Sequence, residues 1–183
     1  NFFLGWGLSF YNFSIKGKNQ NITKSRTLCL NQGKIVISKV LLEKCFAEIR
    51  GIFLTRDLIH LPPNILTPYN YEKIIKNSLK EFSPKFKSYK DKQLEKNFPL
   101  INIVGRSSEN KPALIDMQWS KIKKNKFPNI TLIGKGVTFD SGGLDIKPSS
   151  SMLLMKKDMG GSAVVLGIAY TLMSISCPVN LRV

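Results

Sequence analysis

The sequence predicts an α/β domain in which a layered mixed sheet is flanked by helices. Short apolar runs rich in β-formers alternate with longer segments whose apolar residues recur at helical spacing. With 183 residues, 43% of them hydrophobic, the chain is long enough for a packed core and too apolar for a disordered tail. No run approaches the roughly 18 apolar residues of a membrane span, so an integral membrane protein is not expected.

Two helices are expected in the first half of the chain. Residues 40–61 carry apolar side chains at helical spacing, interrupted by Gly51, and a pair of prolines stops them. Thr67 and the proline after it are typical of a cap and first turn, which predicts a second helix over roughly 68–82. The apolar residues that share one side of this second helix are Tyr71, Ile74, Ile75 and Leu79.

The second half predicts strands and one buried helix. The lysine-rich stretch 83–98 is expected to be exposed, with a short strand inside it. Three β-rich runs follow, and a charged loop separates the last two. The run GGSAVVLGIAYTLMSI, which starts at Gly160, is apolar on every side and predicts a buried helix, while 178–183 is typical of a strand. The three β-rich runs are 100–106, 112–119 and 130–137.

The net charge of +16 raises the question of a polyanionic partner. Only five of the 28 basic residues are arginines, whose planar guanidinium group matches the geometry of phosphate best. The lysines are spread from Lys16 to Lys157 and are mixed with acids. Solvated lysine faces are therefore favoured, and nucleic-acid binding is kept as the weaker alternative.

The cysteines and the histidine argue against a structural zinc site. Cys29, Cys45 and Cys177 form no C-x-x-C pair, which predicts reduced, mostly buried thiols in a cytosolic protein. His60 is the only histidine, so a zinc site of the Cys/His type is excluded. Its position at the end of a predicted helix favours a structural role.

The chemistry is concentrated in residues 134–161. This segment holds three of the six aspartates, six glycines and four lysines, and it joins a predicted strand to the buried helix, where α/β folds place their sites. It matches neither a Walker A loop nor a G-x-S-x-G elbow. Asp140 and Asp158, with Lys135, could form a set of metal ligands. The alternative is a tight glycine-stabilised turn with solvated charges.

The string GKGVTFDSGGLDIKP, followed by MKKDMGG, resembles the metal-binding segment of the leucyl aminopeptidase family, the M17 cytosol aminopeptidases. KPALIDMQW, TRDLIHLPPN and GWGLSFYNF resemble the same family in the same order, so the resemblance covers essentially the whole chain. The chain departs from the family at His60, where Asn is usual. The fold that the resemblance implies is the first half of an aminopeptidase catalytic domain.

The resemblance also implies a site with two divalent metal ions, Mn²⁺ or Zn²⁺. Lys135 and Asp158 would bind one ion, and Asp140 would bridge both. Lys147 would be the catalytic lysine, a cation directed at the scissile carbonyl oxygen. Met155 would line the pocket for the first side chain of the substrate. The implied reaction is release of N-terminal amino acids, with a leucine-type preference, from peptides with a free N-terminus.

The family's second motif, N-T-D-A-E-G-R, does not occur in the 183 residues. The resemblance therefore implies a remnant of an N-terminal domain over 1–38, a linker helix over 39–61 and a truncated catalytic domain over 62–183. We expect this chain alone to be inactive and to bind at most one ion. A cytoplasmic homo-hexamer without membrane contact is expected of the full-length family, and Asp145 is expected to be a loop acid. The alternative is a non-catalytic fragment or a basic nucleic-acid-binding protein.

Overall fold

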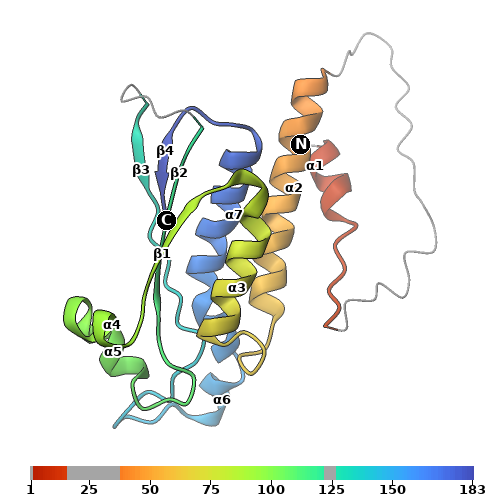
Figure 1. The fold of residues 1–183 in the computed structure, drawn as a ribbon. Coiled ribbons are helices and arrows are strands. Elements are labelled where there is room, and N and C mark those ends of the chain that lie inside the picture. The colour runs from red at the N-terminus through yellow and green to blue at the C-terminus, as the bar shows by residue number, and fades with distance from the viewer. Residues whose placement is uncertain (1, 16–37, 122–126) are drawn as a thin grey trace.

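The computed structural model describes residues 2–15, 38–121 and 127–183. One four-stranded sheet has the order β1-β2-β4-β3, and helices lie against it in a second layer (Figure 1). The strands are β1 (Lys85–Tyr89), β2 (Leu114–Ser120), β3 (Asn129–Thr131) and β4 (Asn180–Arg182). The helices are α1 (Phe2–Leu8), α2 (Lys39–His60), α3 (Pro68–Leu79), α4 (Asp91–Asn97), α5 (Pro99–Gly105), α6 (Ser149–Met152) and α7 (Gly160–Ser174), with the 3-10 helices η1 (Lys80–Phe82) and η2 (Met155–Met159).

The sheet is mixed, as predicted. β1 pairs with β2 and β2 with β4 in antiparallel fashion, whereas β3 and β4 are parallel. Strands were expected within 83–98, 112–119 and 178–183, and β1, β2 and β4 confirm them. Across the sheet the Arg182 guanidinium donates two hydrogen bonds, of 2.9 and 2.8 Å, to the Asp116 carboxylate.

The two predicted N-terminal helices are present. The Thr67 hydroxyl accepts a bond from the backbone amide of Asn70, so α3 begins with the expected cap. Gly51 interrupts the apolar pattern but not the helix, because α2 is continuous from Lys39 to His60. A Cβ at Gly51 would lie 2.5 Å from the carbonyl oxygen of Gly167. The glycine therefore serves close packing of α2 on α7, and it does not break the helix.

The core lies between the sheet and the helix layer. Tyr71, Ile75 and Leu79 of α3 are buried, which confirms the predicted apolar side of that helix. Glu72 is buried beside them, a position that apolar periodicity does not predict. The largest side chains with almost no exposed surface are Leu58, Leu66, Leu79, Leu94, Met117, Met159 and Met173.

Three predictions on the apolar runs need correction. The strand expected over 100–106 is absent: residues 100–105 belong to the short helix α5, because Pro99 supplies a first-turn proline and β-propensity depends on a strand partner. The run 130–137 is a strand only to Thr131, since its partner β4 pairs with it over three residues. The helix from Gly160 is not buried on every side: Val164 and Ile168 are 46% and 43% exposed.

The remaining predictions concern cysteines and membrane spans. Cys45 and Cys177 are free and half-buried, while Cys29 lies outside the described residues. Part of the charged loop expected before β3, residues 122–126, also lies outside them. Within the described ranges, each helix is too short or too polar to cross a lipid bilayer.

Candidate active site

The segment from Gly134 to Asp158 leaves the sheet after β3 and crosses the beginning of α7 before it returns through α6 and η2 (Figure 1). A Cβ at Gly134 would lie 2.5 Å from the Cα of Ser162, so only glycine allows this crossing. The backbone amide of Ser162 donates a 2.9 Å bond to the carbonyl of Lys135. The backbone of Lys135 is therefore fixed against the first turn of a helix.

A pair of hydroxyls supports that first turn. The Ser162 hydroxyl donates to the carbonyl of Met159 at 2.6 Å, and it lies 2.7 Å from the Tyr71 hydroxyl, which must then be the donor in their bond. Burial raises the pKa of Tyr71 to about 12, so the phenol keeps its proton at neutral pH. Sequence reasoning missed this pair because its members are 91 residues apart.

A tight turn brings Asp140 and Lys147 together. The backbone amide of Lys147 donates to the carbonyl of Ser141 at 2.9 Å. Gly142 within the turn has a φ of 97°, and a Cβ there would lie 2.4 Å from the carbonyl oxygen of Asp145. The Asp140 carboxylate accepts a 3.0 Å bond from the amide of Gly142 and pairs with the Lys147 ammonium. The glycine-stabilised turn expected for this segment is thus present.

The second ion pair joins the two ends of the segment. The Lys135 ammonium lies 3.3 Å from the Asp158 carboxylate. Asp158 and Met155 are three residues apart in η2, where side chains at this spacing share one face. The sulfur of Met155 lies 3.2 Å from the Lys147 ammonium, so both ion pairs contact the same 3-10 helix. Four of the five residues singled out from the sequence, all but Met155, thus form two carboxylate–lysine pairs.

The donor set fits part of a metal shell. Two atoms bound to one ion at 2.0–2.2 Å lie about 3 Å apart, close to the 3.3 Å between the Lys135 amine and the Asp158 carboxylate. Carboxylates suit divalent cations, and an amine can join them only after it gives up its proton. Within the described ranges, no three His, Cys, Asp or Glu side chains are grouped so that they could hold a metal ion. Lys135 and Asp158 could hold one ion through these two donors.

The remaining residues considered in the sequence analysis are Met155, Asp145 and His60. Met155 is buried, with 3% of its surface exposed, and its contact with Lys147 is the one that bears on the site. Asp145 is exposed in a bend, as expected for a loop acid. The His60 ring packs against the rings of Tyr11 and Phe13 at the end of α2, with centroid distances of 6.0 and 5.1 Å, which agrees with a structural role.

The chain is similar to a family of known proteins. Residues 53–183 match the family model for the catalytic domain of the cytosol aminopeptidase family. The chain is 38% identical over 143 residues to a probable cytosol aminopeptidase of Wolbachia pipientis, and 42% identical over 132 residues to one of Chlamydia caviae. These alignments cover 75% and 71% of the chain but 28% and 26% of the relatives. The chain thus spans little more than a quarter of their length.

Solved structures agree with the fold. The crystal structure of the cytosol aminopeptidase from Coxiella burnetii is 40% identical, with a TM-score of 0.79 over 98% of this chain and 37% of that one. The bottromycin maturation enzyme BotP in complex with Mn is 26% identical, with a TM-score of 0.78 and the same coverage of both chains. The predicted α/β fold with a mixed sheet is the fold of these neighbours.

Proposed function

The chain belongs to the cytosol aminopeptidase (M17) family, and from that premise we propose that it carries part of the active site of a metal-dependent aminopeptidase. The substrates would be peptides with a free N-terminus, with a preference for leucine-type first residues. The names of the relatives support the peptidase activity. The observation that carries the proposal is the presence of two lysine–carboxylate pairs that both contact η2, one through Asp158 and the other through Met155.

We propose that Lys135 and Asp158 bind one ion and that Asp140 bridges it to a second. The 3.3 Å separation of the Lys135 and Asp158 donor atoms supports a shared ion. Mn²⁺ and Zn²⁺ are the proposed metals, and the similarity to an Mn-bound enzyme supports the first. When bound, such ions supply a polarised water and positive charge beside the substrate carbonyl.

Lys147 is proposed as the catalytic cation. Its ammonium is held by the Asp140 carboxylate on one side and the Met155 sulfur on the other, which limits its rotation. A fixed ammonium stabilises the negative charge that develops on the carbonyl oxygen in the transition state. Met155 would meet the first side chain of the substrate while it orients Lys147.

The larger organisation is proposed on the same premise. Residues 1–38 would belong to an N-terminal domain, 39–61 to a linker helix, and 62–183 to the catalytic domain. Continuous α2 supports the linker helix. A cytoplasmic homo-hexamer is the proposed assembly, and the word cytosol in the relatives' names supports its location.

Metal binding tests the ligands directly. Equilibrium dialysis of the 183-residue chain against Mn²⁺ should give at most one bound ion, because a single bridging carboxylate cannot hold a second ion against water. Asp158→Asn should abolish this binding, while Asp145→Asn, a change of the same kind in an exposed bend, should preserve it. Two tightly bound ions together with turnover of leucine amide would contradict the proposal.

Activity is tested in a protein that contains this segment together with an N-T-D-A-E-G-R segment. It should hydrolyse leucine amide with Mn²⁺ and leave N-acetyl-leucine amide intact, since the free amino group is needed at the metal. Lys147→Ala should lower kcat by on the order of 10²-fold at unchanged metal content. Lys157→Ala is the matched control, because this lysine is exposed and close in sequence. Loss of metal in the Lys147 variant would instead assign that lysine a structural role.

A further inference from the structure

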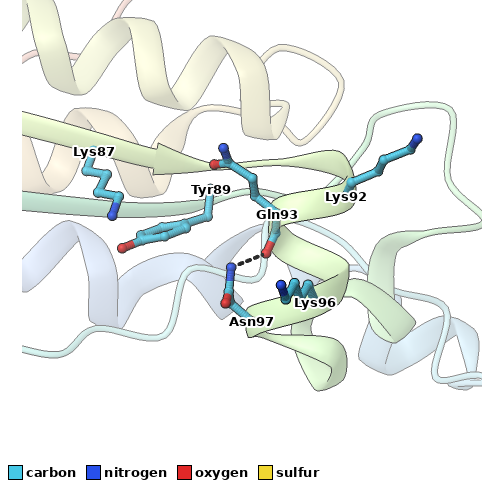
Figure 2. Close-up of a pocket in the computed structure, with 6 residues that line it drawn as sticks. All are labelled: Lys87, Tyr89, Lys92, Gln93, Lys96 and Asn97. Atoms are coloured by element: carbon cyan, nitrogen blue, oxygen red, sulfur yellow. Dashed lines mark hydrogen bonds between the residues drawn. The ribbon is translucent and has the colours of Figure 1, made fainter.

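A concave site lies between the edge strand β1 and helix α4, with a volume of about 440 Å³ (Figure 2). None of its lining residues belongs to the segment 134–158, and none of them is acidic. The residues that line it are Lys87, Tyr89, Lys92, Gln93, Lys96 and Asn97. The hollow is open to solvent, because the residues that α4 contributes to it are all exposed.

The lysines of this pocket lack acidic partners. Within the described part of the chain, no carboxylate lies within ion-pair distance of Lys87, Lys92 or Lys96. The neighbouring Lys76 and Lys90, by contrast, are both paired with the buried Glu72. The pocket therefore keeps positive charge that its surroundings do not neutralise.

Helix α4 separates its charges between two faces. Its acids, Asp91 and Glu95, are four residues apart and line a different hollow, which also contains Arg106 and Lys111. Lys96 and Asn97 face the β1 pocket, and Lys92 borders both hollows. The side of α4 toward β1 is thus basic and amide-rich, and the acids of the same helix are used elsewhere.

Contacts with Phe98 and Lys87 hold the ring of Tyr89, the aromatic side chain that lines the pocket. The Tyr89 ring packs edge-on against Phe98, with a centroid distance of 5.0 Å, and the Lys87 ammonium lies 4.6 Å from its centroid. The Asn97 amide donates a 2.9 Å bond to the backbone carbonyl of Gln93. Figure 2 shows Lys87 and Tyr89 side by side on the strand, with this bond on the facing helix. The donors of strand and helix are therefore presented on ordered elements.

We propose that this pocket binds a small oligophosphate, a ligand with at least two adjacent phosphate groups. Separate lysine ammoniums act as point charges for phosphate oxygens, and several around one hollow favour a compact anion of high charge. A nucleic-acid strand would need a longer track of cations and stacking rings than one hollow supplies. The competing explanation is that the lysines only protect an edge strand from pairing with other chains.

Calorimetric titration of the 183-residue chain with sodium tripolyphosphate tests the site. We expect saturable binding at one site, which weakens as salt screens the charges. The double variant Lys87→Gln/Lys96→Gln should weaken it by on the order of tenfold or more, because two charge-assisted contacts are lost. The control Lys44→Gln/Lys80→Gln removes the same charge from exposed positions outside the pocket, and it should change the affinity by less than about twofold.

Comparison ligands identify the chemistry. Adenosine diphosphate should compete with tripolyphosphate, since the phosphates carry the recognition. If the pocket variant and the control lose the same affinity for tripolyphosphate, the net charge of the chain and not the pocket causes the binding, and the proposal is overturned. Tighter binding of a single-stranded oligonucleotide than of tripolyphosphate would overturn it in favour of nucleic acid. Absence of saturable binding would leave the lysines as protection of the β1 edge, and it would not affect the proposed peptidase site.

Discussion

The contact between α2 and α7 differs sharply from the segment that carries the candidate active site. Where the helices cross, Gly51 and Gly167 allow backbone to meet backbone, and the Thr55 hydroxyl reaches across to the carbonyl of Ala163 at 3.1 Å. In the site segment, Leu144 is fully exposed and Leu153 is 80% exposed. One region is held by dense packing, and the other by a few polar contacts.

The tightly packed helix crossing contributes stability, whereas the loosely packed site segment carries the candidate chemistry. The site segment is anchored where Gly134 and Lys135 cross the start of α7, and again where η2 leads into that helix. Between the anchors, the turn around Gly142 needs only its own hydrogen bonds to bring Asp140 to Lys147. A rigid scaffold that carries a loosely packed functional loop is a common arrangement.

The largest effect is expected at the helix crossing. A Cβ at Gly167 would lie 2.1 Å from the Thr55 hydroxyl and 2.5 Å from the carbonyl oxygen of Gly51, so Gly167→Ala must push the helices apart. We expect the free energy of unfolding in urea to fall by about 3 kcal/mol. Gly160→Ala is the matched control in the same helix: its Cβ would meet Ile59 at an ordinary 3.7 Å, and stability should be unchanged or slightly raised. Equal losses in both variants would refute the close-packing argument.

A smaller effect is expected at Glu72, which joins α3 to β1. Burial would raise the pKa of this carboxyl, but hydrogen bonds from Lys76, Lys90 and Ser88 outweigh it and lower the pKa to about 2. Glu72→Gln removes the charge that these donors share, and it should cost about 2 kcal/mol of unfolding free energy at pH 7. Glu95→Gln, an exposed change of the same kind, should cost less than about 0.5 kcal/mol.

The pH dependence of Glu72 has a defined sign. Its pKa is lowered in the folded chain from 4.5 to about 2, so its contribution is complete above 4.5 and is lost as the pH falls toward 2. In urea titrations between pH 6 and pH 2.5, the stability difference between the wild type and Glu72→Gln should therefore shrink with acidity. A difference that stays constant over that range would show that Glu72 acts through packing alone.

The smallest effect is expected in the site segment. Leu144 makes so little contact that Leu144→Ser should change the free energy of unfolding by less than about 0.5 kcal/mol, measured by urea titration. Leu58→Ser, at a side chain that is 1% exposed, is the comparison in the core, where the same change should be severely destabilising. A loss above about 1 kcal/mol at Leu144 would mean that the segment is packed in solution.

The sequence located the candidate site but not its supports. Asp140 and the glycines after it are close along the chain, so charges and glycines in one string indicated them, whereas Lys147 was named only through the resemblance to the aminopeptidase family. The Tyr71–Ser162 pair and the burial of Glu72 depend on elements far apart in sequence, and no local pattern indicates them. The β1 pocket was missed for the same reason, since lysines spread along the chain gave no sign of where they would gather.

The sequence by itself determined the α/β class, the capped helix α3, strands β2 and β4, and the string in which charged groups could meet, because caps, prolines and apolar periodicity act over a few residues. Only the tertiary structure decided that Gly51 lies inside a continuous helix, that residues 100–105 form a helix and no strand, and that α7 keeps an exposed side. The fit of Gly51 against Gly167 and the coverage of α7 depend on partners from distant parts of the chain, whereas α5 also has a local cause in Pro99. The elements that pack against a glycine decide whether it ends a helix or allows two helices to approach closely. In the same way, the partners of a β-rich run decide whether it forms a strand or a helix.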